Sequence, residues 1–517
     1  MWAWRCLGFP VVQTRYDFII VGGGAAGCVL AAGLSVSGAE VLLIESGGLD
    51  DGPTITNPSI WFHNVGGPLD YNLPITPSAR LNNRKLNLPL GHVLGGGSSI
   101  NAMVWTRGMQ QDFDGWAANG AKGWAFADVL PIYKSQEDWE GGANTWRGVG
   151  GPVHLRQPRD PHPTAPAFIS AAREMGMPIL DDVNGPMRPG AGYINMNIAA
   201  DGTRVSAARA FLRPALSRPN LTVLLNTAVV KLNCANTRCV GVKTATGDIA
   251  ADTEVILAAG TIGSAKLLML SGIGDADALG KRGIDIVENL PGVGNNLQDH
   301  ILLSGVVFTY KGTMPDRPAD SNAVEAEAFL SSGVSSDTDC ALVLHQLGAI
   351  APEAAARFGA PPADAFAIAP ALVQPTSRGA VRLASNNFQD APVIDANYLA
   401  TDHDVSVIVR AIEAARELGA QHAFDGVREK EIVPGCKASA EDIRDLVRLA
   451  SNSFGHPVGT CKMGIDPLAV VDPELRVHGM LGLRVADASV IPQTIRGPGT
   501  NAVTQMIAGK ASKLILG

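Results

Sequence analysis

Residues 16–46 read YDFIIVGGGAAGCVLAAGLSVSGAEVLLIES, and this stretch decides the fold. Residues 16–21 are almost wholly apolar, as expected for a strand covered on both faces, and they run directly into three consecutive glycines at 22–24. Residues 26–34 then predict a helix, and residues 41–44 predict the next strand. The stretch therefore predicts the strand–turn–helix–strand unit of a parallel α/β sheet.

The glycines have the spacing G-x-G-x-x-G, at Gly22, Gly24 and Gly27. In dinucleotide-binding folds the first permits the tight turn, the second lets a pyrophosphate approach the backbone, and the third lets the helix pack closely on the strand. Glu45 follows about 20 residues later, where a carboxylate accepts hydrogen bonds from ribose hydroxyls. The unit therefore predicts dinucleotide binding rather than a merely structural turn. FAD and NAD share this fingerprint, so these residues do not choose between them.

Composition limits the class of protein. A chain of 517 residues exceeds one ordinary hydrophobic core, which predicts two domains or one large domain with an added layer. Its 58 glycines and 33 prolines are spread along a chain that is 46% hydrophobic, as in a turn-rich globular enzyme. A formal net charge of −8 and the lack of a basic run predict no nucleic-acid partner and no binding to an anionic membrane surface.

The N-terminal segment, the cysteines and the spacing of candidate metal ligands give further expectations. Residues 1–15 lack a long apolar core and a small-residue cleavage site, so we expect no signal peptide, and no later stretch reaches membrane-spanning length. Cys234 and Cys239 lie close enough to pair across a turn, but reduced thiols in a cytoplasmic protein are the preferred interpretation of the seven cysteines. No histidines, cysteines or carboxylates have metal-ligand spacing, so we expect no metal.

The rest of the chain alternates helical and strand-like segments. We expect helix at 112–139, a proline- and glycine-rich crossing into a second domain at 141–202, two strands around a turn at 233–238 within 221–242, and a buried strand at 254–259. We further expect a separate sheet domain at 302–454, with a strand at 379–384 and a helix at 404–418. After it we expect a strand at 483–486 and a terminal helix near Asn501, with Thr500 and Asn501 as N-cap residues.

A second glycine cluster, GHVLGGGSSINAMVWTRG, occupies residues 91–108 and follows no obvious strand. Its backbone amides and small hydroxyls would suit contact with an extended ligand, and the alternative is a glycine-rich surface loop. Further motifs follow in order: GTIGSAKLLMLSGIG (260–274), PGVGNNLQDH (291–300), HPVGTCKMG (456–464), VVDPELRVHG (470–479) and LRVADASVIP (483–492). Together these motifs resemble the glucose-methanol-choline (GMC) family of FAD-dependent alcohol oxidases and dehydrogenases over essentially the full length.

The resemblance implies FAD rather than NAD and an α/β GMC fold. A Rossmann-like FAD-binding domain would be assembled from residues 14–155, 205–301 and 455–517, with an inserted α+β antiparallel-sheet substrate domain at 156–204 and 302–454. Carried over position by position, it places Gly22, Gly24, Ala26 and Gly27 at the pyrophosphate, Glu45 at the adenosine ribose and Val229 beside the adenine. It places Asp487 and Ala488 at the ribityl chain and the pyrophosphate. The residues at the flavin would be Gly97, Ser98, Asn101, Ala102, Val104, Asn501 and Ala502. The neighbouring Ala25, Ser46, His92, Val93, Met103, Ala259 and Gly260 complete the cofactor-binding set.

Three departures from the family pattern bear on the site. His92 stands where arginine or lysine is usual, which weakens a charge contact there. Ile100 stands where covalently flavinylated members have histidine, so the resemblance implies noncovalent FAD. Gly499, beside Pro498, stands where many members have a polar partner for the catalytic histidine, and Gly455 is small as well, which would leave room for a ring-bearing substrate.

Oxidising an alcohol removes a hydroxyl proton and a carbinol hydride, so the site needs a base. His456 is the predicted base, because imidazole has an unperturbed pKa of about 6.5. Without a partner at Gly499 it would work nearly alone, and a structural role is the preferred interpretation of His300. The resemblance implies oxidation of a primary alcohol, aromatic or otherwise uncharged, with O2 or another electron acceptor. A choline-type dehydrogenase, a non-redox FAD-containing lyase and an FAD-bound structural or sensor protein remain alternatives.

Overall fold

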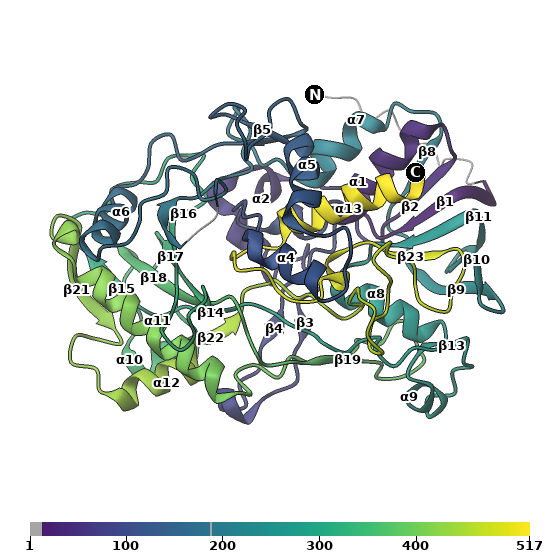
Figure 1. The fold of residues 1–517 in the computed structure, drawn as a ribbon. Helices are drawn as coiled ribbons and strands as arrows, with labels where there is room; N and C mark the ends of the chain where they lie inside the picture. Colours follow the sequence, from purple (N-terminus) through teal and green to yellow (C-terminus); the bar gives the residue numbers. More distant parts are fainter. Residues whose placement is uncertain (1–12, 187–188) are drawn as a thin grey trace.

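Two large sheets organise the molecule. The computed structural model describes residues 13–186 and 189–517. Figure 1 shows the sheet that contains β1 (Arg15–Val21) toward one end and the sheet that contains β15 (Val307–Tyr310) toward the other. The C-terminal helix α13 (Asn501–Leu516) lies along the first of them, beside α1 (Ala25–Leu34).

The first sheet is built around the strand that precedes the glycine turn. Its order is β8–β2–β1–β11–β10–β9, and β23 pairs with β11. The strands β1, β2, β8, β11 and β23 are parallel to their neighbours along this part of the sheet, while β9 and β10 form an antiparallel extension. The further bounds are Val41–Ile44 (β2), Leu221–Leu224 (β8), Val229–Ala235 (β9), Arg238–Thr244 (β10), Gly247–Leu257 (β11) and Leu483–Val485 (β23). Because α1 is apolar on nearly every side, it is buried between this sheet and α13.

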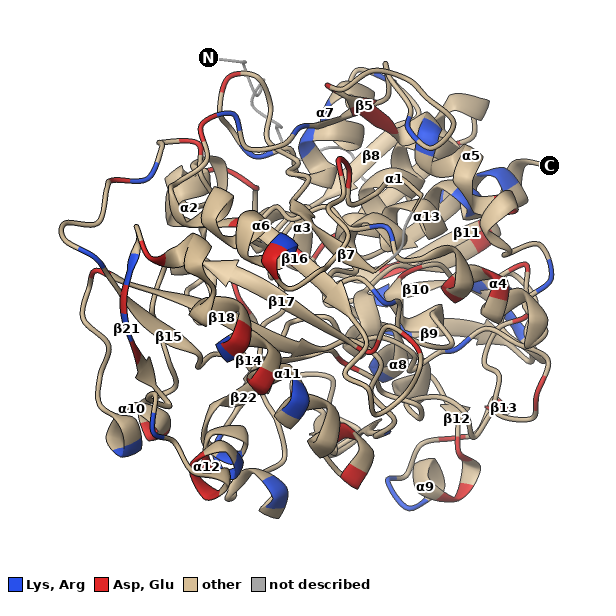
Figure 2. Cartoon of the chain, turned by 60° about the vertical axis from the view of Figure 1, so that its left-hand side comes forward, with Lys and Arg blue, Asp and Glu red and all other residues tan. Residues whose placement is uncertain are grey.

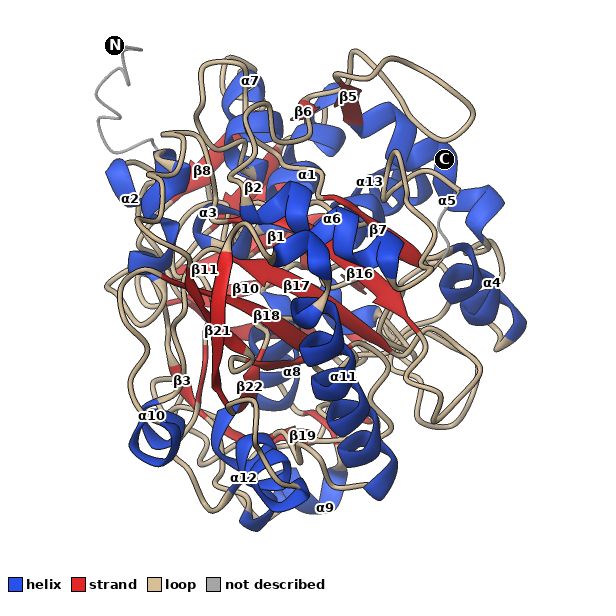
Figure 3. Ribbon diagram, turned by 90° about the vertical axis from the view of Figure 1, so that its left-hand side faces the viewer, coloured by secondary structure: helices blue, strands red, loops and turns tan. Residues whose placement is uncertain are grey.

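The second sheet is antiparallel and has the order β21–β15–β18–β17–β16–β7, with β14 pairing with both β18 and β22. Its further strands are Gly190–Tyr193 (β7), Ile301–Leu303 (β14), Val324–Leu330 (β16), Cys340–His345 (β17), Ala365–Leu372 (β18), Arg428–Val433 (β21) and Ser451–Ser453 (β22). Figure 3 shows α6 (Thr164–Glu174) and α11 (Asp402–Ala420) lying across one face of it. The other face is therefore available to border a site.

Shorter elements connect the two sheets. They are α2 (Pro53–Thr56), α3 (Gly97–Ile100), α4 (Gln110–Ala118), α5 (Phe126–Gln136), α7 (Arg213–Ala215), α8 (Gly260–Leu270), α9 (Ala276–Gly280), α10 (Pro352–Phe358) and α12 (Ala440–Ala450), with β3 (Leu73–Pro74), β4 (Asn87–Leu88), β5 (Glu137–Trp139), β6 (Val153–Leu155), β12 (Ile273–Gly274), β13 (Glu288–Asn289), β19 (Ala380–Arg382) and β20 (Val393–Asp395). Both β21 and α12 carry basic and acidic residues (Figure 2), so neither presents a single sign of charge.

Two local predictions were wrong in detail, and the predicted N-cap of the terminal helix is confirmed in position alone. Residues 221–242 contain three strands, not two, because the chain leaves the sheet after β8 through Asn226, whose φ is 52°. Residues 112–139 form two helices and a short strand, since a break that contains Gly120 and Gly123 separates α4 from α5. Thr500 occupies the N-cap position of α13, but its side chain makes no capping hydrogen bond.

Several expectations concern absences or covalent links. Cys234 and Cys239 face each other across β9 and β10, yet both thiols are free, as are the other cysteines of the described residues. No helix in residues 13–186 or 189–517 is long and apolar enough to cross a membrane. The same residues contain no group of three or more side chains that could hold a metal ion. The expectation about a signal peptide falls mostly on residues 1–12, outside the described residues.

Candidate active site

A single cavity of about 960 Å³ is lined by residues from both sheets. One part is bordered by the glycine turn after β1, by residues 96–98 and 100–102, and by the beginnings of α8 and α13. The other part is bordered by β14, β16, β17 and residues 453–457. The volume lies at the upper end of the range for ligand sites, about 300–1,000 Å³, so the cavity has room for a large cofactor together with a small substrate.

The glycine turn forms a cradle of bare backbone. A Cβ atom at Gly27 would lie 1.8 Å from the carbonyl oxygen of Gly22, so only glycine lets α1 approach the turn this closely. Gly24 and Ala25, at the N-terminus of α1, border the cavity, and a helix N-terminus favours phosphate groups. At Gly97 and Gly260 an added Cβ would meet no atom within 4 Å, so the backbone there borders open space.

Polar groups at two places in this cradle suit a dinucleotide. Glu45 accepts hydrogen bonds from the backbone nitrogens of Gly23 and Gly47, each at 2.7 Å, which hold its carboxylate at the cavity wall. Its remaining lone pairs are available to ribose hydroxyls. Asn501 also borders the cavity, and its Nδ2 has no hydrogen-bond partner among the described residues. The cradle, the carboxylate and the unpaired amide therefore fit an FAD.

Most of the predicted cofactor-binding residues border the cavity. They are Gly22, Gly24, Ala25, Ala26, Glu45, Ser46, His92, Gly97, Ser98, Asn101, Ala102, Val104, Val229, Ala259, Gly260, Asp487, Ala488 and Asn501. Gly27, Val93, Met103 and Ala502 do not border it. Gly27 is covered by the turn, and the other three are at most 1% exposed within the core behind the wall, so their contact with FAD stays a prediction.

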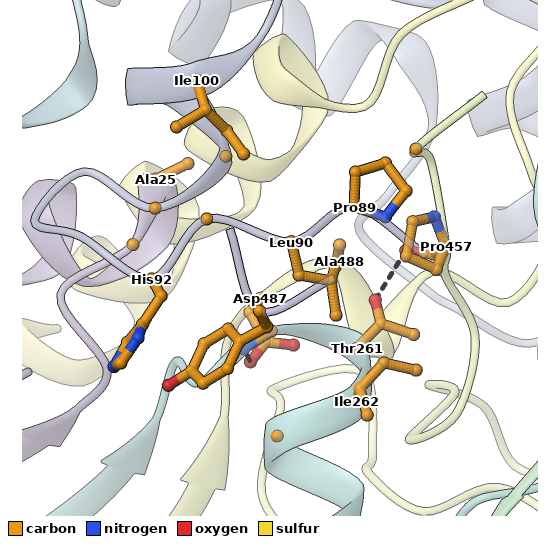
Figure 4. A pocket seen from close by; sticks show the side chains of 18 of the residues that line it. Ala25, Pro89, Leu90, His92, Ile100, Thr261, Ile262, Pro457, Asp487 and Ala488 are labelled. Atoms are coloured by element: carbon orange, nitrogen blue, oxygen red, sulfur yellow. Dashed lines mark hydrogen bonds between the residues drawn. The ribbon is translucent and has the colours of Figure 1, made fainter. Parts of the chain in front are cut away.

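Figure 4 shows part of this wall, with Ile100 and Ala25 on one side and Asp487 and Ala488 opposite. The hydroxyl of Thr261, at the start of α8, donates a hydrogen bond to the carbonyl oxygen of Pro457 (2.6 Å). This bond ties the cofactor side of the cavity to the segment that carries His456.

The predicted base has a partner from a distant part of the chain. β14 and β22 pair with Ile301 opposite Ser453, which brings His300, just before β14, next to His456, just after β22. The two Nδ1 atoms are 3.1 Å apart, and the rings meet edge to face at 5.2 Å between centroids. His456 therefore has a polar partner that the sequence did not indicate, at a place other than Gly499.

The hydrogen bonds of His300 determine which nitrogen of His456 carries the proton. Nε2 of His300 lies 3.0 Å from the carbonyl oxygen of Ile495, which can only accept, so Nε2 is protonated. Burial lowers the pKa of His300 to about 4, so the ring is neutral at pH 7 and its Nδ1 is an acceptor. His456 consequently donates from Nδ1, and its Nε2 keeps a free lone pair. A neutral imidazole in this tautomer can take a proton at Nε2.

Further contacts fix the backbone and charge of His456. Its backbone nitrogen donates to Oδ1 of Asp299 at 2.9 Å, and Oδ2 of Asp299 accepts from the hydroxyls of Tyr398 and Ser453. Burial raises the pKa of Asp299 to about 6, against the lowering effect of these hydrogen bonds. Burial, followed by the neighbouring His300, holds the pKa of His456 well below its usual value.

Sequence reasoning missed the wall opposite the cofactor cradle. Val324 and Glu327 of β16, with Val343 and His345 of β17, border the cavity there. Aromatic and aliphatic side chains from other segments, Trp61, Tyr71, Leu302 and Phe454, also contribute. Tyr71 stacks on His92 with 4.2 Å between ring centroids, so His92 is held by an aromatic contact rather than by a charge. The one available signal was the pair of acids in the otherwise apolar segment VEAEAFL.

A dinucleotide cradle that opens into a second chamber beside a neutral histidine fits a flavin-dependent oxidoreductase acting on CH–OH groups. Comparison with known proteins agrees with this class. The chain belongs to the GMC oxidoreductase family, whose N-terminal model matches residues 16–302 and whose C-terminal model matches residues 375–508. The cofactor of this enzyme is accordingly FAD.

The similarity to known proteins extends along nearly the whole chain. The oxygen-dependent choline dehydrogenase of Brucella suis is 38% identical over 530 residues, covering 97% of this chain and 95% of that protein. The enzyme of the same description from Sinorhizobium medicae is 39% identical over 534 residues, with the same coverage. Among solved structures, pyridoxine 4-oxidase from Mesorbium loti has a TM-score of 0.90 and 32% identity, covering 96% of this chain and 98% of that chain. An FAD-dependent oxidoreductase from Chaetomium thermophilum has a TM-score of 0.87 and 26% identity, covering 97% and 99%.

Proposed function

We propose that this enzyme oxidises a primary alcohol that carries an aromatic or heteroaromatic ring to the corresponding aldehyde, with His456 as the base. The observation that carries the proposal is the neutral His456 at the cavity wall, whose hydrogen bond to His300 leaves Nε2 free to accept a proton. Gly455 and Gly499 border the same space with no side chains, which leaves room for a ring next to the base.

The residues have distinct tasks in this reaction. The alcohol hydroxyl donates to Nε2 of His456, which takes the proton as the carbinol C–H bond breaks. Bound FAD supplies the acceptor for the hydride, and O2 or another oxidant regenerates it. The proton that His456 gains is stabilised through its Nδ1–H bond to neutral His300, while Asp299 keeps the backbone of His456 in place. The glycine turn, Glu45 and Asn501 would hold the cofactor.

We further propose that FAD is held without a covalent bond and that the chain divides as predicted. Ile100, at the position of the histidyl link, has an inert side chain at the cavity wall. The strands of the first sheet all lie within the segments 14–155, 205–301 and 455–517 proposed for the FAD-binding domain. Apart from Ile301 of β14, the second sheet comes from the proposed substrate domain at 156–204 and 302–454.

Oxidation of a choline-type alcohol is the second candidate function. It is favoured by the 38% identity to choline dehydrogenases and by Trp61 and Phe454 at the cavity, since aromatic faces attract quaternary ammonium groups. It needs a quaternary ammonium group to enter a wall in which Val324, Val343 and Leu302 lie beside Glu327. A substrate panel separates the two candidates.

The test is anaerobic mixing of the FAD-loaded enzyme with benzyl alcohol, choline and ethanol while the visible flavin band is followed. We expect the fastest bleaching with benzyl alcohol. His456→Ala should slow bleaching on the order of 10²-fold while FAD stays bound, the usual scale for a positioned base. A panel that leaves the flavin oxidised would contradict alcohol oxidation, and normal bleaching in His456→Ala would contradict the assignment of the base.

A further inference from the structure

One wall of the cavity carries a carboxyl group that the chemistry at His456 does not use. Glu327 lies on β16, is 0% exposed and borders the cavity. Neither of its carboxylate oxygens has a hydrogen-bond partner among the described residues. Because buried polar groups are almost always paired, two unpaired oxygens at a cavity wall indicate a partner that arrives with a ligand.

The backbone turns Glu327 toward the cavity. Val324 and Glu327 are three residues apart, so in a regular strand they would face opposite sides of the sheet. The pairing between β16 and β17 shifts register between these two residues, and a β-bulge of this kind re-aims the side chains that follow it. Both residues therefore border the cavity, together with Val343 and His345 of the neighbouring strand.

Glu325, on the same strand, is a buried carboxylate whose two oxygens both accept hydrogen bonds. Its Oε1 accepts a hydrogen bond from the hydroxyl of Ser321 at 2.7 Å, and its Oε2 accepts one from the backbone nitrogen of His162 at 2.8 Å. It does not border the cavity. Two acids on one strand thus differ sharply, and the one that lacks internal partners is the one at the cavity.

The surroundings of Glu327 select a basic partner. Burial alone raises the pKa of Glu327 to about 8, with no neighbouring charge contributing. A buried carboxyl group in this state donates a hydrogen bond to an unprotonated nitrogen, or pairs as the carboxylate with a protonated one. Nε2 of His345 on the same wall is buried and also lacks a partner among the described residues, so this end of the cavity is polar.

Apolar side chains connect the strands that carry this polar end with His456. The ring of Phe454 lies 4.6 Å from that of His456 between centroids, and it packs against the cluster that contains Val324 and Val343. A substrate that reaches both ends therefore crosses aromatic and aliphatic side chains. A flat ring with its carbinol group at one end and a polar atom at the other fits this sequence of surfaces.

We propose that Glu327 determines substrate specificity by binding the basic nitrogen of a heteroaromatic alcohol whose carbinol group lies at His456. This inference rests on the proposed function and narrows its substrate class from ring-bearing alcohols to those with a basic ring nitrogen. His345 would form a hydrogen bond with a second polar substituent on the same ring, as donor or as acceptor.

The first experiment compares 4-pyridinemethanol with benzyl alcohol, which has the same shape without the nitrogen. The ratio of their kcat/KM values is measured by flavin bleaching for the parent enzyme, Glu327→Leu and Glu327→Gln. A hydrogen bond to an ionisable group corresponds to about 10- to 150-fold, so the parent should prefer the pyridine by at least about tenfold. Glu327→Leu should bring the ratio close to one, and Glu327→Gln, which keeps a donor, should give an intermediate ratio.

The second experiment measures binding without turnover. Titration calorimetry compares 4-methylpyridine with toluene, neither of which has a carbinol group. We expect 4-methylpyridine to bind the parent at least about tenfold more tightly than toluene, and this difference to disappear in Glu327→Leu. Glu325→Gln is the matched control, since it changes an acid of the same strand that does not border the cavity, and it should keep the preference of the parent.

The outcomes separate the two proposals. If no alcohol bleaches the flavin, the proposed function fails, while the calorimetry still tests Glu327. If benzyl alcohol is oxidised as well as 4-pyridinemethanol, or if Glu327→Leu changes the ratio by less than about threefold, the inference is overturned and alcohol oxidation stands. If Glu327→Leu does not fold with FAD, Glu327→Gln takes its place in both comparisons, and a preference for the pyridine that stays equal to the parent's in Glu327→Gln overturns the inference.

Discussion

The bond between His300 and His456 leads to a prediction whose size can be worked out from the geometry. Leucine and asparagine have nearly the same shape, but the Oδ1 atom of asparagine occupies the place of Nδ1 of histidine and accepts a hydrogen bond. In His300→Leu, the Nδ1–H group of His456 has no acceptor in place of the one now 3.1 Å away. An unsatisfied buried donor costs about 1–3 kcal/mol of free energy, and here the cost falls on the tautomer of His456 that leaves Nε2 free. The rate of flavin reduction should therefore fall about 5- to 150-fold. In His300→Asn the loss should stay below about fivefold.

The assay is anaerobic stopped-flow reduction of the bound flavin by benzyl alcohol. Both variants lose the second hydrogen bond of His300, from Nε2 to the carbonyl oxygen of Ile495, so both should unfold at a similarly lowered temperature. The visible spectrum checks that FAD remains bound. Stability is thereby matched between the variants, and the difference in rate reports the acceptor at Nδ1 alone.

Two results would refute this account of the pair. Equal rate losses in His300→Leu and His300→Asn would mean that His300 acts only by filling space. Rates close to the parent in both variants would mean that the tautomer of His456 is fixed without His300. A loss confined to His300→Leu, with a normal KM, identifies His300 as the residue that positions the base.

Three further predictions follow from the site. The FAD should be released by acid or heat denaturation, because Ile100 offers no atom for a covalent link, and yellow colour that stays with precipitated protein would contradict this. Burial keeps the pKa of His456 well below its usual value, so the base stays unprotonated as the pH falls. The value of kcat/KM should therefore stay level from pH 8 to below about 6.5 before it declines, and a decline that begins at or above about pH 6.5 would indicate another base. Gly455 has φ +78°, so Gly455→Ala and Gly455→Trp share a left-handed backbone strain of about 1–2 kcal/mol and a lowered melting temperature, but only Gly455→Trp should further depress kcat/KM for benzyl alcohol relative to ethanol.

The cofactor side of the cavity was predictable because its determinants are local in sequence. The spacing of Gly22, Gly24 and Gly27 needs only one strand, one turn and one helix, and Glu45 lies at the end of the next strand. The glycines act through their backbone, and the pairing of β1 with β2 brings the carboxylate of Glu45 next to them. In the structure the carboxylate of Glu45 accepts a hydrogen bond from the backbone nitrogen of Gly23, so the two ends of this unit meet.

The substrate side was not predictable to the same depth because it depends on pairing between distant segments. His300 and His456 meet only because β14 pairs with β22, a register that neither short strand encodes alone. Glu327 borders the cavity because of an irregular pairing between β16 and β17, whereas strict alternation along VEAEAFL would place Val324 and Glu327 on opposite faces. A one-residue irregularity thus decides which acid lines the site.

The residues proposed to contact the cofactor and those proposed to contact the substrate lie mainly on different sheets. The groups to which we assign the choice and activation of the alcohol lie on or beside the second sheet: His456 follows β22, Leu302 lies on β14, Glu327 on β16 and His345 on β17. The groups of the cradle belong to the first sheet and the helices that follow its strands. A change at Glu327 can therefore alter which alcohol is accepted without moving any atom of the glycine turn. The hydrogen bond from Thr261 to Pro457 is a direct link between the two sides, so substitutions there should disturb FAD binding and catalysis together, whereas substitutions on β16 should not.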